Sequence, residues 1–151
     1  MKKLILTTKA CDRALLINDS LEQLSEFNTD LTPLVYKCFF RRYPEARELF
    51  GHDENDSLKG DMLSRLIVQI MDCAEGRANS EIIASWASDH IAYGVKFEMF
   101  PAMFDSLEEA LRELLGDESW TPSLQEAWQF QFGGLLAIVE AAFQRFSHTA
   151  K

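Results

Sequence analysis

The candidate metal ligands in this chain are its three histidines, His52, His90 and His148. A neutral imidazole binds a metal through one ring nitrogen, and the hydrogen bond of the other nitrogen fixes which one. His52 lies in a polar segment and His148 lies near the C-terminal end, whereas His90 stands near the end of a helical pattern that Gly94 terminates. A lone histidine on a helix is more often a structural or surface residue than a ligand. Composition and periodicity alone therefore leave metal ligation by His90 as the less favoured interpretation.

The sequence contains no motif of the other common kinds of catalytic site. There is no glycine-rich loop of the kind that cradles a nucleotide phosphate, and the cysteines and histidines do not cluster at zinc-site spacings. A Ser-His-Asp set cannot be singled out, because geometry rather than order along the chain defines it. Paired carboxylates such as Glu108 and Glu109 lie between apolar helix positions, so we interpret them as part of a solvated helix face.

Composition limits the class of protein. The 151 residues suit one domain, 47% of them are hydrophobic, and the net charge is −9. An acidic surface is repelled by phosphate backbones and by anionic lipid headgroups, so nucleic acid and membranes are disfavoured as partners. The three cysteines, Cys11, Cys38 and Cys73, are too few and too irregular for a disulfide framework, which indicates a reducing compartment.

The N-terminal segment begins like a secretory signal, with two lysines before an apolar run. That run stops at Thr7, however, which makes it shorter than the ~7–15 apolar residues that such a signal needs. No other segment is long enough to span a bilayer. We therefore expect a cytoplasmic protein.

The spacing of apolar residues at intervals of three and four predicts helices along most of the chain. Thr32-Pro33 and Thr121-Pro122 predict two helix starts, and Ser57 and Ser80 are candidate caps of two more. There is no internal repeat or dividing linker, so the pattern predicts an all-α domain of six or seven helices. The expected helical segments are 15–24, 32–40, a short one from 44 to 50, 57–71, 80–92, one that begins before or near Pro101 and runs through Leu114, and 122–146.

Three segments of the chain resemble the globin family. An aromatic-rich stretch leads through Pro44 to Phe50 (35–50), His90 is followed by Gly94-Val95, and Gly116 precedes Trp120-Thr121-Pro122 and Ala127-Trp128. They fall in the family's order and cover about 14–146. The sequence is similar to single-domain bacterial haemoglobins and to the globin domain of flavohaemoglobins. The resemblance implies a globin fold of six to eight helices around a haem pocket. Residues 1–151 would form a single domain, with the N-terminal residues as a short extension.

The resemblance also implies roles for individual residues. His90 would be the proximal ligand of a haem b iron, and its other ring nitrogen would donate a hydrogen bond to a backbone carbonyl near Trp86. Phe50 would pack flat on the porphyrin. Tyr36 would lie over the distal face as the catalytic residue, where its hydroxyl could donate a hydrogen bond to a bound gas. The remaining cofactor contacts would be Leu63 and Ile67 on the distal side, and Val95, Phe100 and Met103 at the proximal edge.

The distal side departs from the family pattern. The position that often carries His or Gln falls on Lys59, or on Gly60 if the register shifts by one residue. Lys59 would either reach a haem propionate or, as a neutral amine, bind the iron; the first alternative is preferred. Gly60 would leave a more open pocket with Tyr36 as the one obvious donor. His52 is a further candidate partner for a propionate.

The proximal side departs as well. Phe100 stands where the flavohaemoglobin network of His, Tyr and Glu has its tyrosine, and Glu140 is out of register with the glutamate. Because that network makes the histidine more basic, its loss weakens the case for oxygen activation. The sequence ends at Lys151 without room for a flavin- or NAD-binding reductase domain, so turnover would need an external reductase.

The function implied by the resemblance is reversible binding of O2, NO or CO by a haem, with detoxification of NO by dioxygenation as the enzymatic activity to test. One alternative is a haem-based gas or redox sensor that acts through a partner protein. Another is a globin-fold regulator that binds no haem, against which His90 and Phe50 together argue.

Overall fold

The computed structural model of the chain is helical throughout the residues that it describes, 2–27, 30–51 and 56–149, with side chains in the terminal helices given from 9 to 146, Ala10 apart. Six α-helices and one 3-10 helix in these ranges confirm the predicted all-α class. None of the helices in this part of the chain is long and apolar enough to cross a membrane. The helices are α1 (Lys2–Glu26), α2 (Thr32–Arg42), the 3-10 helix η1 (Pro44–Phe50), α3 (Ser57–Ala74), α4 (Ser80–Ala92), α5 (Met99–Leu115) and α6 (Pro122–Thr149).

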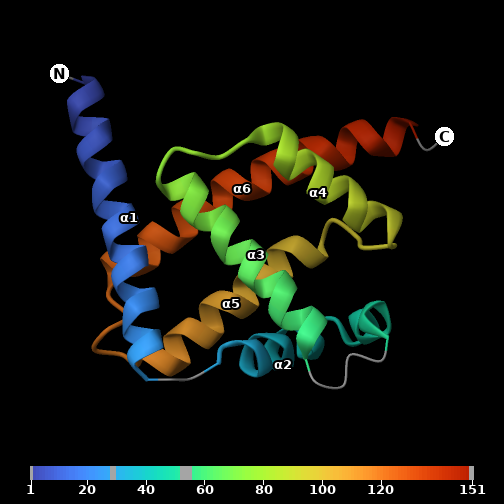
Figure 1. Cartoon of the computed structure of the whole chain (residues 1–151), viewed down its shortest axis with the longest axis horizontal. Coiled ribbons are helices and arrows are strands. Elements are labelled where there is room, and N and C mark those ends of the chain that lie inside the picture. The colour runs from blue at the N-terminus through green and yellow to red at the C-terminus, as the bar shows by residue number, and fades with distance from the viewer. Residues whose placement is uncertain (1, 28–29, 52–55, 150–151) are drawn as a thin grey trace.

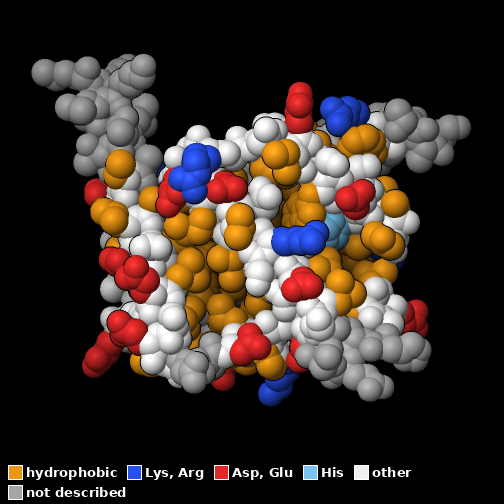
Figure 2. Space-filling model, viewed as in Figure 1, with side chains coloured by type: hydrophobic (Ala, Val, Ile, Leu, Met, Phe, Trp, Pro, Cys, Tyr) orange, Lys and Arg blue, Asp and Glu red, His pale blue; other side chains and the backbone are white. Residues whose placement is uncertain are grey.

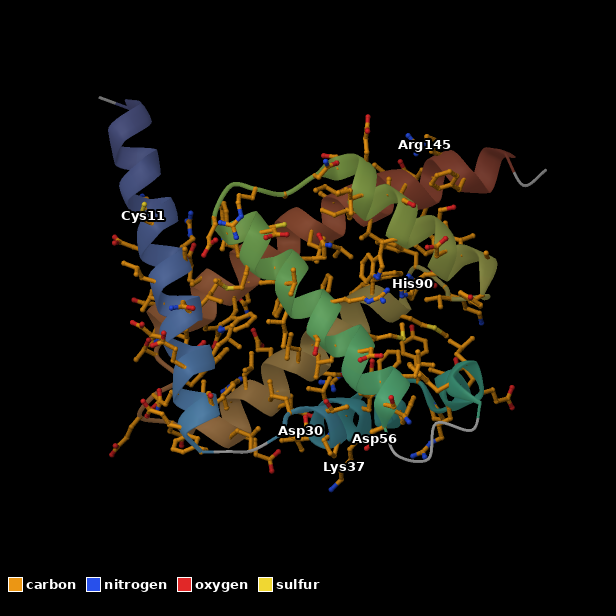
Figure 3. The ribbon with its side chains drawn as sticks, in the orientation of Figure 1. Cys11, Asp30, Lys37, Asp56, His90 and Arg145 are labelled. Carbon is orange, nitrogen blue, oxygen red and sulfur yellow. The ribbon has the colours of Figure 1, made fainter. Side chains whose placement is uncertain are left out.

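The helices cross one another around a shared apolar interior. Figure 1 shows α6 running diagonally behind α3 and α4, with α1 along one side and α2 along the lower edge. The closest packing joins α2 to α5, α4 to α6 and α1 to α6. The first helix begins well before the segment expected from Leu15, and its N-terminal part projects beyond the other helices (Figure 1). Cys11 lies on that side of the molecule, far from His90 (Figure 3).

Trp128 anchors α6 in the core. Its side chain is fully buried, and its indole Nε1 donates a hydrogen bond to Ser20 Oγ of α1 at 3.2 Å. The Ser20 hydroxyl in turn donates to the carbonyl of Ile17 at 2.6 Å, so both buried polar groups are satisfied. At the surface, Arg13 of α1 pairs with Glu126 of α6 at 2.9 Å. These contacts fix the frame on which α4 rests, because α4 packs on α6.

A polar cluster joins α2 to α5 and so sets the separation of two helices that face each other across the interior. Arg41 Nη2 lies 2.6 Å from Glu109 Oε2, and Arg42 Nη1 donates to the buried Ser106 hydroxyl at 3.2 Å. Hydrogen bonds from the Cys38 thiol and from Arg41 hold the pKa of Glu109 below its usual range. Burial, with the Glu109 carboxylate beside it, raises the pKa of Cys38 to about 11, so this thiol stays protonated and unreactive at neutral pH.

Side-chain caps begin two of the helices. Thr121 Oγ1 accepts the amide of Leu124 at 3.1 Å, as expected of a Thr-Pro start. The cap of α4 is Asn79, whose side-chain oxygen accepts from the amides of Glu81 and Ile82, so the choice of Ser80 was wrong by one residue. At α3 the cap position is Asp56 rather than Ser57, and its side chain makes no capping hydrogen bond.

A Schellman-type turn ends α4 just after His90. The Val95 amide donates to the His90 carbonyl at 3.0 Å, and the Gly94 amide donates to the Ile91 carbonyl at 3.0 Å. Gly94 has φ +90°, a conformation that L side chains rarely adopt. The turn therefore fixes the backbone of His90 and directs the chain into Val95 and α5.

Substitution by alanine should change the free energy of unfolding in opposite directions at Gly94 and at Gly134. Gly94→Ala places a Cβ on a residue at φ +90° and should lower the free energy of unfolding by about 1–2 kcal/mol. Gly134→Ala lies inside α6, where an added Cβ meets nothing within 4 Å, and should raise it by about 0.8–1.0 kcal/mol. Urea unfolding of both variants checks this, and stabilisation by Gly94→Ala would contradict the assigned turn.

Candidate functional site

An apolar cavity with a volume of about 660 Å³ lies between η1, α2, α3, α4 and α5. Apolar and aromatic side chains form most of its wall, and it opens to the surface. Figure 2 shows His90, in pale blue, through an opening bordered by hydrophobic side chains. Eight residues proposed from the sequence line this cavity: Tyr36, Phe50, Leu63, Trp86, His90, Val95, Phe100 and Met103.

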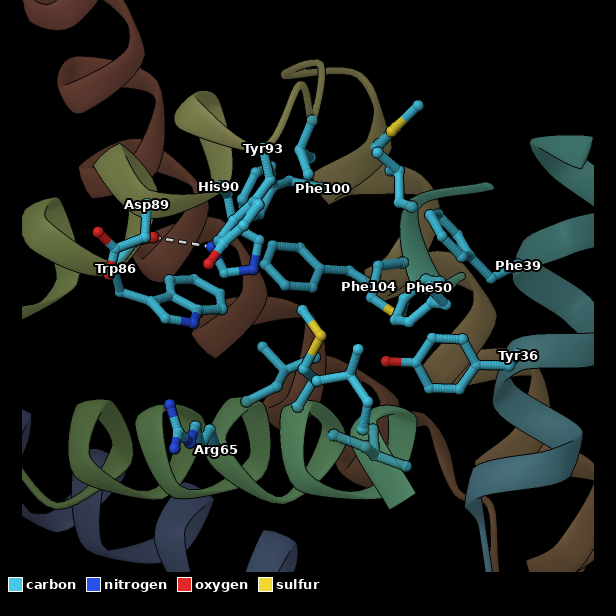
Figure 4. A pocket seen from close by; sticks show the side chains of 18 of the residues that line it. Tyr36, Phe39, Phe50, Arg65, Trp86, Asp89, His90, Tyr93, Phe100 and Phe104 are labelled. Carbon is cyan, nitrogen blue, oxygen red and sulfur yellow. Dashed lines mark hydrogen bonds between the residues drawn. The ribbon is translucent and has the colours of Figure 1, made fainter. Parts of the chain in front are cut away.

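His90 enters the cavity from α4 with one ring nitrogen already engaged. Its Nδ1 lies 2.7 Å from the backbone carbonyl oxygen of Trp86, one turn earlier (dashed line in Figure 4). A carbonyl can only accept, so Nδ1 carries the proton and a neutral ring keeps its lone pair on Nε2. The cavity wall therefore carries an imidazole nitrogen suited to bind a metal.

Tyr36 lies across the cavity from His90, on α2. The residue is 4% exposed, and Figure 4 shows its hydroxyl pointing inward, toward the middle of the cavity. Its ring packs edge-on against Phe50, with centroids 5.2 Å apart, and against Phe39 at 6.3 Å. This aromatic packing holds the phenol in one orientation.

The wall formed by α3 differs from the one expected. Its lining residues are Leu58, Met62, Leu63, Arg65 and Leu66, so Leu63 reaches the cavity and Ile67 is not among the lining residues.

Lys59 and Gly60, the two candidates for the distal position, do not line the cavity either. The Lys59 ammonium lies 3.2 Å from Asp56 Oδ1 and 5.5 Å from the centre of the Phe50 ring. A Cβ on Gly60 would face Thr32 of α2 at 3.8 Å. The distal wall on α3 is therefore aliphatic and thioether, apart from Arg65.

The mouth of the cavity carries residues that the sequence did not single out. Arg65 of α3 and Asp89 of α4 are both exposed and stand on its two sides (Figure 4). Tyr93, at 80% exposed, and the partly exposed Leu49 and Leu58 complete the rim. Exposed polar residues on helices are common, so no sequence signal distinguishes Arg65 and Asp89 from other surface charges. Interior lining residues also missed are Phe39, Met62, Leu66, Met99 and Phe104.

Three further residues considered from the sequence are Glu140, His52 and His148. Glu140 is exposed on α6 and is not a lining residue. His52 and the side chain of His148 lie outside the described residues. No group of three or more His, Cys, Asp or Glu side chains in the described part of the chain could hold a metal. A metal held here would need ligands from a cofactor in addition to His90.

The residues present fit a flat, largely apolar group with a metal at its centre. The walls would supply Phe50, Phe100 and Leu66 for apolar contact, and His90 could supply one ligating nitrogen. At the mouth, the Arg65 guanidinium could meet an acidic substituent of such a group.

This chain is similar in sequence to known globins and to globin-containing proteins. A family model described as Globin matches residues 34–139. Leghemoglobin-1 of Vicia faba is 26% identical over 136 residues, covering 84% of this chain and 94% of that protein. An uncharacterized globin-like protein of Aquifex aeolicus is 26% identical over 133 residues, with 85% and 93% covered. Flavohemoprotein B of Dictyostelium discoideum is 26% identical over 114 residues, covering 75% of this chain and 26% of that protein. This chain thus spans about a quarter of that flavohaemoprotein's length.

A solved structure supports the fold. A bacterial globin from Campylobacter jejuni superposes with a TM-score of 0.68 at 23% identity, covering 91% of this chain and 98% of that one. The family match spans most of the chain and includes Tyr36, Phe50 and His90. This protein is therefore a member of the globin family.

Proposed function

We propose that this globin binds haem through His90 Nε2 and binds a diatomic gas reversibly on the side of the haem that faces Tyr36. The observation that carries the proposal is the hydrogen bond from His90 Nδ1 to the Trp86 carbonyl, 2.7 Å long, in the wall of an apolar cavity of about 660 Å³. Bound haem would supply an iron that can bind O2, NO or CO.

His90 and the cavity walls would do two things for that group. The imidazole would hold the iron as a neutral ligand, because its Nδ1 proton is shared with a carbonyl rather than with a carboxylate. The aromatic and aliphatic side chains would exclude water from both faces of the ring, which strengthens any hydrogen bond made inside.

Tyr36 would be the residue that discriminates between gases. The α3 wall offers aliphatic side chains and the Met62 thioether inside the cavity, so a ligand there would find its donor in the phenol of Tyr36. Bound O2 draws electron density from the iron and accepts a hydrogen bond well, whereas bound CO accepts it poorly. Tyr36 would therefore favour O2 over CO.

NO dioxygenation is the finer activity that we propose for the same site. The balance is O2 + NO + one electron to nitrate, so each turnover consumes an electron that a reductant must supply. The chain's own contribution would be to hold O2 beside Tyr36 and to keep other nucleophiles out of the apolar cavity.

We predict that Tyr36→Phe raises the O2 dissociation rate by roughly 2- to 12-fold, the equivalent of one net hydrogen bond of about 0.5–1.5 kcal/mol. The CO dissociation rate should change much less. Stopped-flow displacement on the haem-loaded, reduced protein measures both. Tyr43→Phe, which removes a hydroxyl outside the cavity lining, is the matched control. If wild type and Tyr36→Phe have equal O2 dissociation rates, Tyr36 does not stabilise bound O2. If the protein shows no saturable binding of O2, the proposed function is refuted.

We predict that NO mixed rapidly with the reduced, O2-equilibrated protein is converted stoichiometrically to nitrate, with oxidation of the haem in the same phase. Nitrate analysis and absorbance after mixing measure the two products. Slow oxidation without nitrate would limit the function to reversible gas binding.

A further inference from the structure

Two aromatic rings enclose the imidazole of His90. The Trp86 indole lies with its centroid 4.6 Å from the imidazole centroid at 68°, and the Phe100 ring lies 5.5 Å away at 62°. The Trp86 and Phe100 rings also pack against each other, with centroids 5.6 Å apart and an interplanar angle of 81°. Figure 4 shows the indole extending from α4 alongside the imidazole. Each ring contacts the imidazole at a steep angle, the arrangement that aromatic pairs prefer.

These rings matter because little else restrains the imidazole. Its described hydrogen bond runs to the Trp86 carbonyl, and in the described part of the chain no carboxylate lies within ion-pair distance of it. A single hydrogen bond at Nδ1 leaves the ring free to rock about its Cβ–Cγ bond, since terminal torsions of this type have broad wells. Contacts on the ring itself are needed to fix the plane.

We propose that the Trp86 side chain is a positioning residue that sets the plane of the His90 imidazole beneath the iron, a role that rests on the proposed function. The same residue acts twice: its carbonyl fixes which nitrogen is free, and its indole, with Phe100, fixes where that nitrogen points. Packing takes the place of the charged partner that would otherwise orient the ring.

The support behind Phe100 shows that its ring is itself held in place. Phe143 of α6 packs on Phe100 with ring centroids 5.5 Å apart, and Phe97 packs on Phe143 with centroids 5.7 Å apart. Phe143 belongs to this aromatic cluster without contacting the imidazole ring. Leucine at position 143 keeps an apolar side chain behind Phe100, so Phe143→Leu removes one aromatic contact of the cluster and leaves both rings that contact the imidazole, Trp86 and Phe100, in the chain.

The test uses the full-length, haem-loaded and reduced protein without added ligand, and measures the iron–histidine stretching band by resonance Raman spectroscopy. Trp86→Leu should lose the single sharp band of wild type and give a split or broadened one, because the imidazole plane is no longer fixed. Trp86→Phe keeps a ring beside the imidazole and should keep the band sharp. Phe143→Leu should keep it sharp as well. Thermal unfolding of each variant reports its stability separately, and Trp86→Met replaces Trp86→Leu if the latter does not fold.

An unchanged sharp band in Trp86→Leu or Trp86→Met would overturn the positioning role while leaving the proposed function intact. A band broadened equally in Phe143→Leu would also overturn it, because the effect would then follow from general packing. If wild type itself binds haem but shows no iron–histidine band, the proposed function fails instead.

Discussion

The constraint on which the site depends is the hydrogen bond between His90 Nδ1 and the carbonyl of Trp86. It uses a backbone acceptor on the same helix, so it forms whenever the last turns of α4 are helical and the ring takes the matching rotamer. Because the carbonyl cannot donate, the bond leaves one nitrogen of a neutral imidazole with its lone pair. The free lone pair on Nε2 is thus a consequence of local helix geometry and requires no charged partner.

The rest of the fold serves to bring an apolar cavity to that nitrogen. Trp128 and Arg13 fix α6 against α1, and α4 rests on α6. The Schellman turn at Gly94 then redirects the chain into α5, whose Phe100 and Met103 form the wall beside His90. On the other side, the cluster around Glu109 holds α2, and with it Tyr36, against α5. The two residues that would face a bound haem therefore belong to helices joined through α5 and α6.

The sequence predicted the helices well and the orientation of α3 less well. Apolar periodicity and Pro-marked starts place the helix bounds within a few residues, except for the start of α1, which lies at Lys2 rather than near Leu15. Asn79 and Ser80 are both good caps, and only the backbone geometry selects Asn79. The face of α3 that meets the cavity depends on how this helix packs on α1 and α6. Apolar residues occur on several of its faces, so Met62 and Ile67 are equally plausible from periodicity. Lys59 and Arg65 show the same limit: both are long cations on α3, and only tertiary packing places Arg65 at the cavity and pairs Lys59 with Asp56.

Whether His90 holds the haem iron is tested most directly by the absorption spectrum of the reduced protein in wild type and His90→Gly, with and without imidazole. Wild type should show the Soret band of a histidine-bound haem. His90→Gly should lose this band or shift it, and free imidazole should restore it by entering the vacated position. His148→Gly, treated alike, should match wild type. If His90→Gly without imidazole has the same spectrum as wild type, His90 is not the ligand of the haem iron.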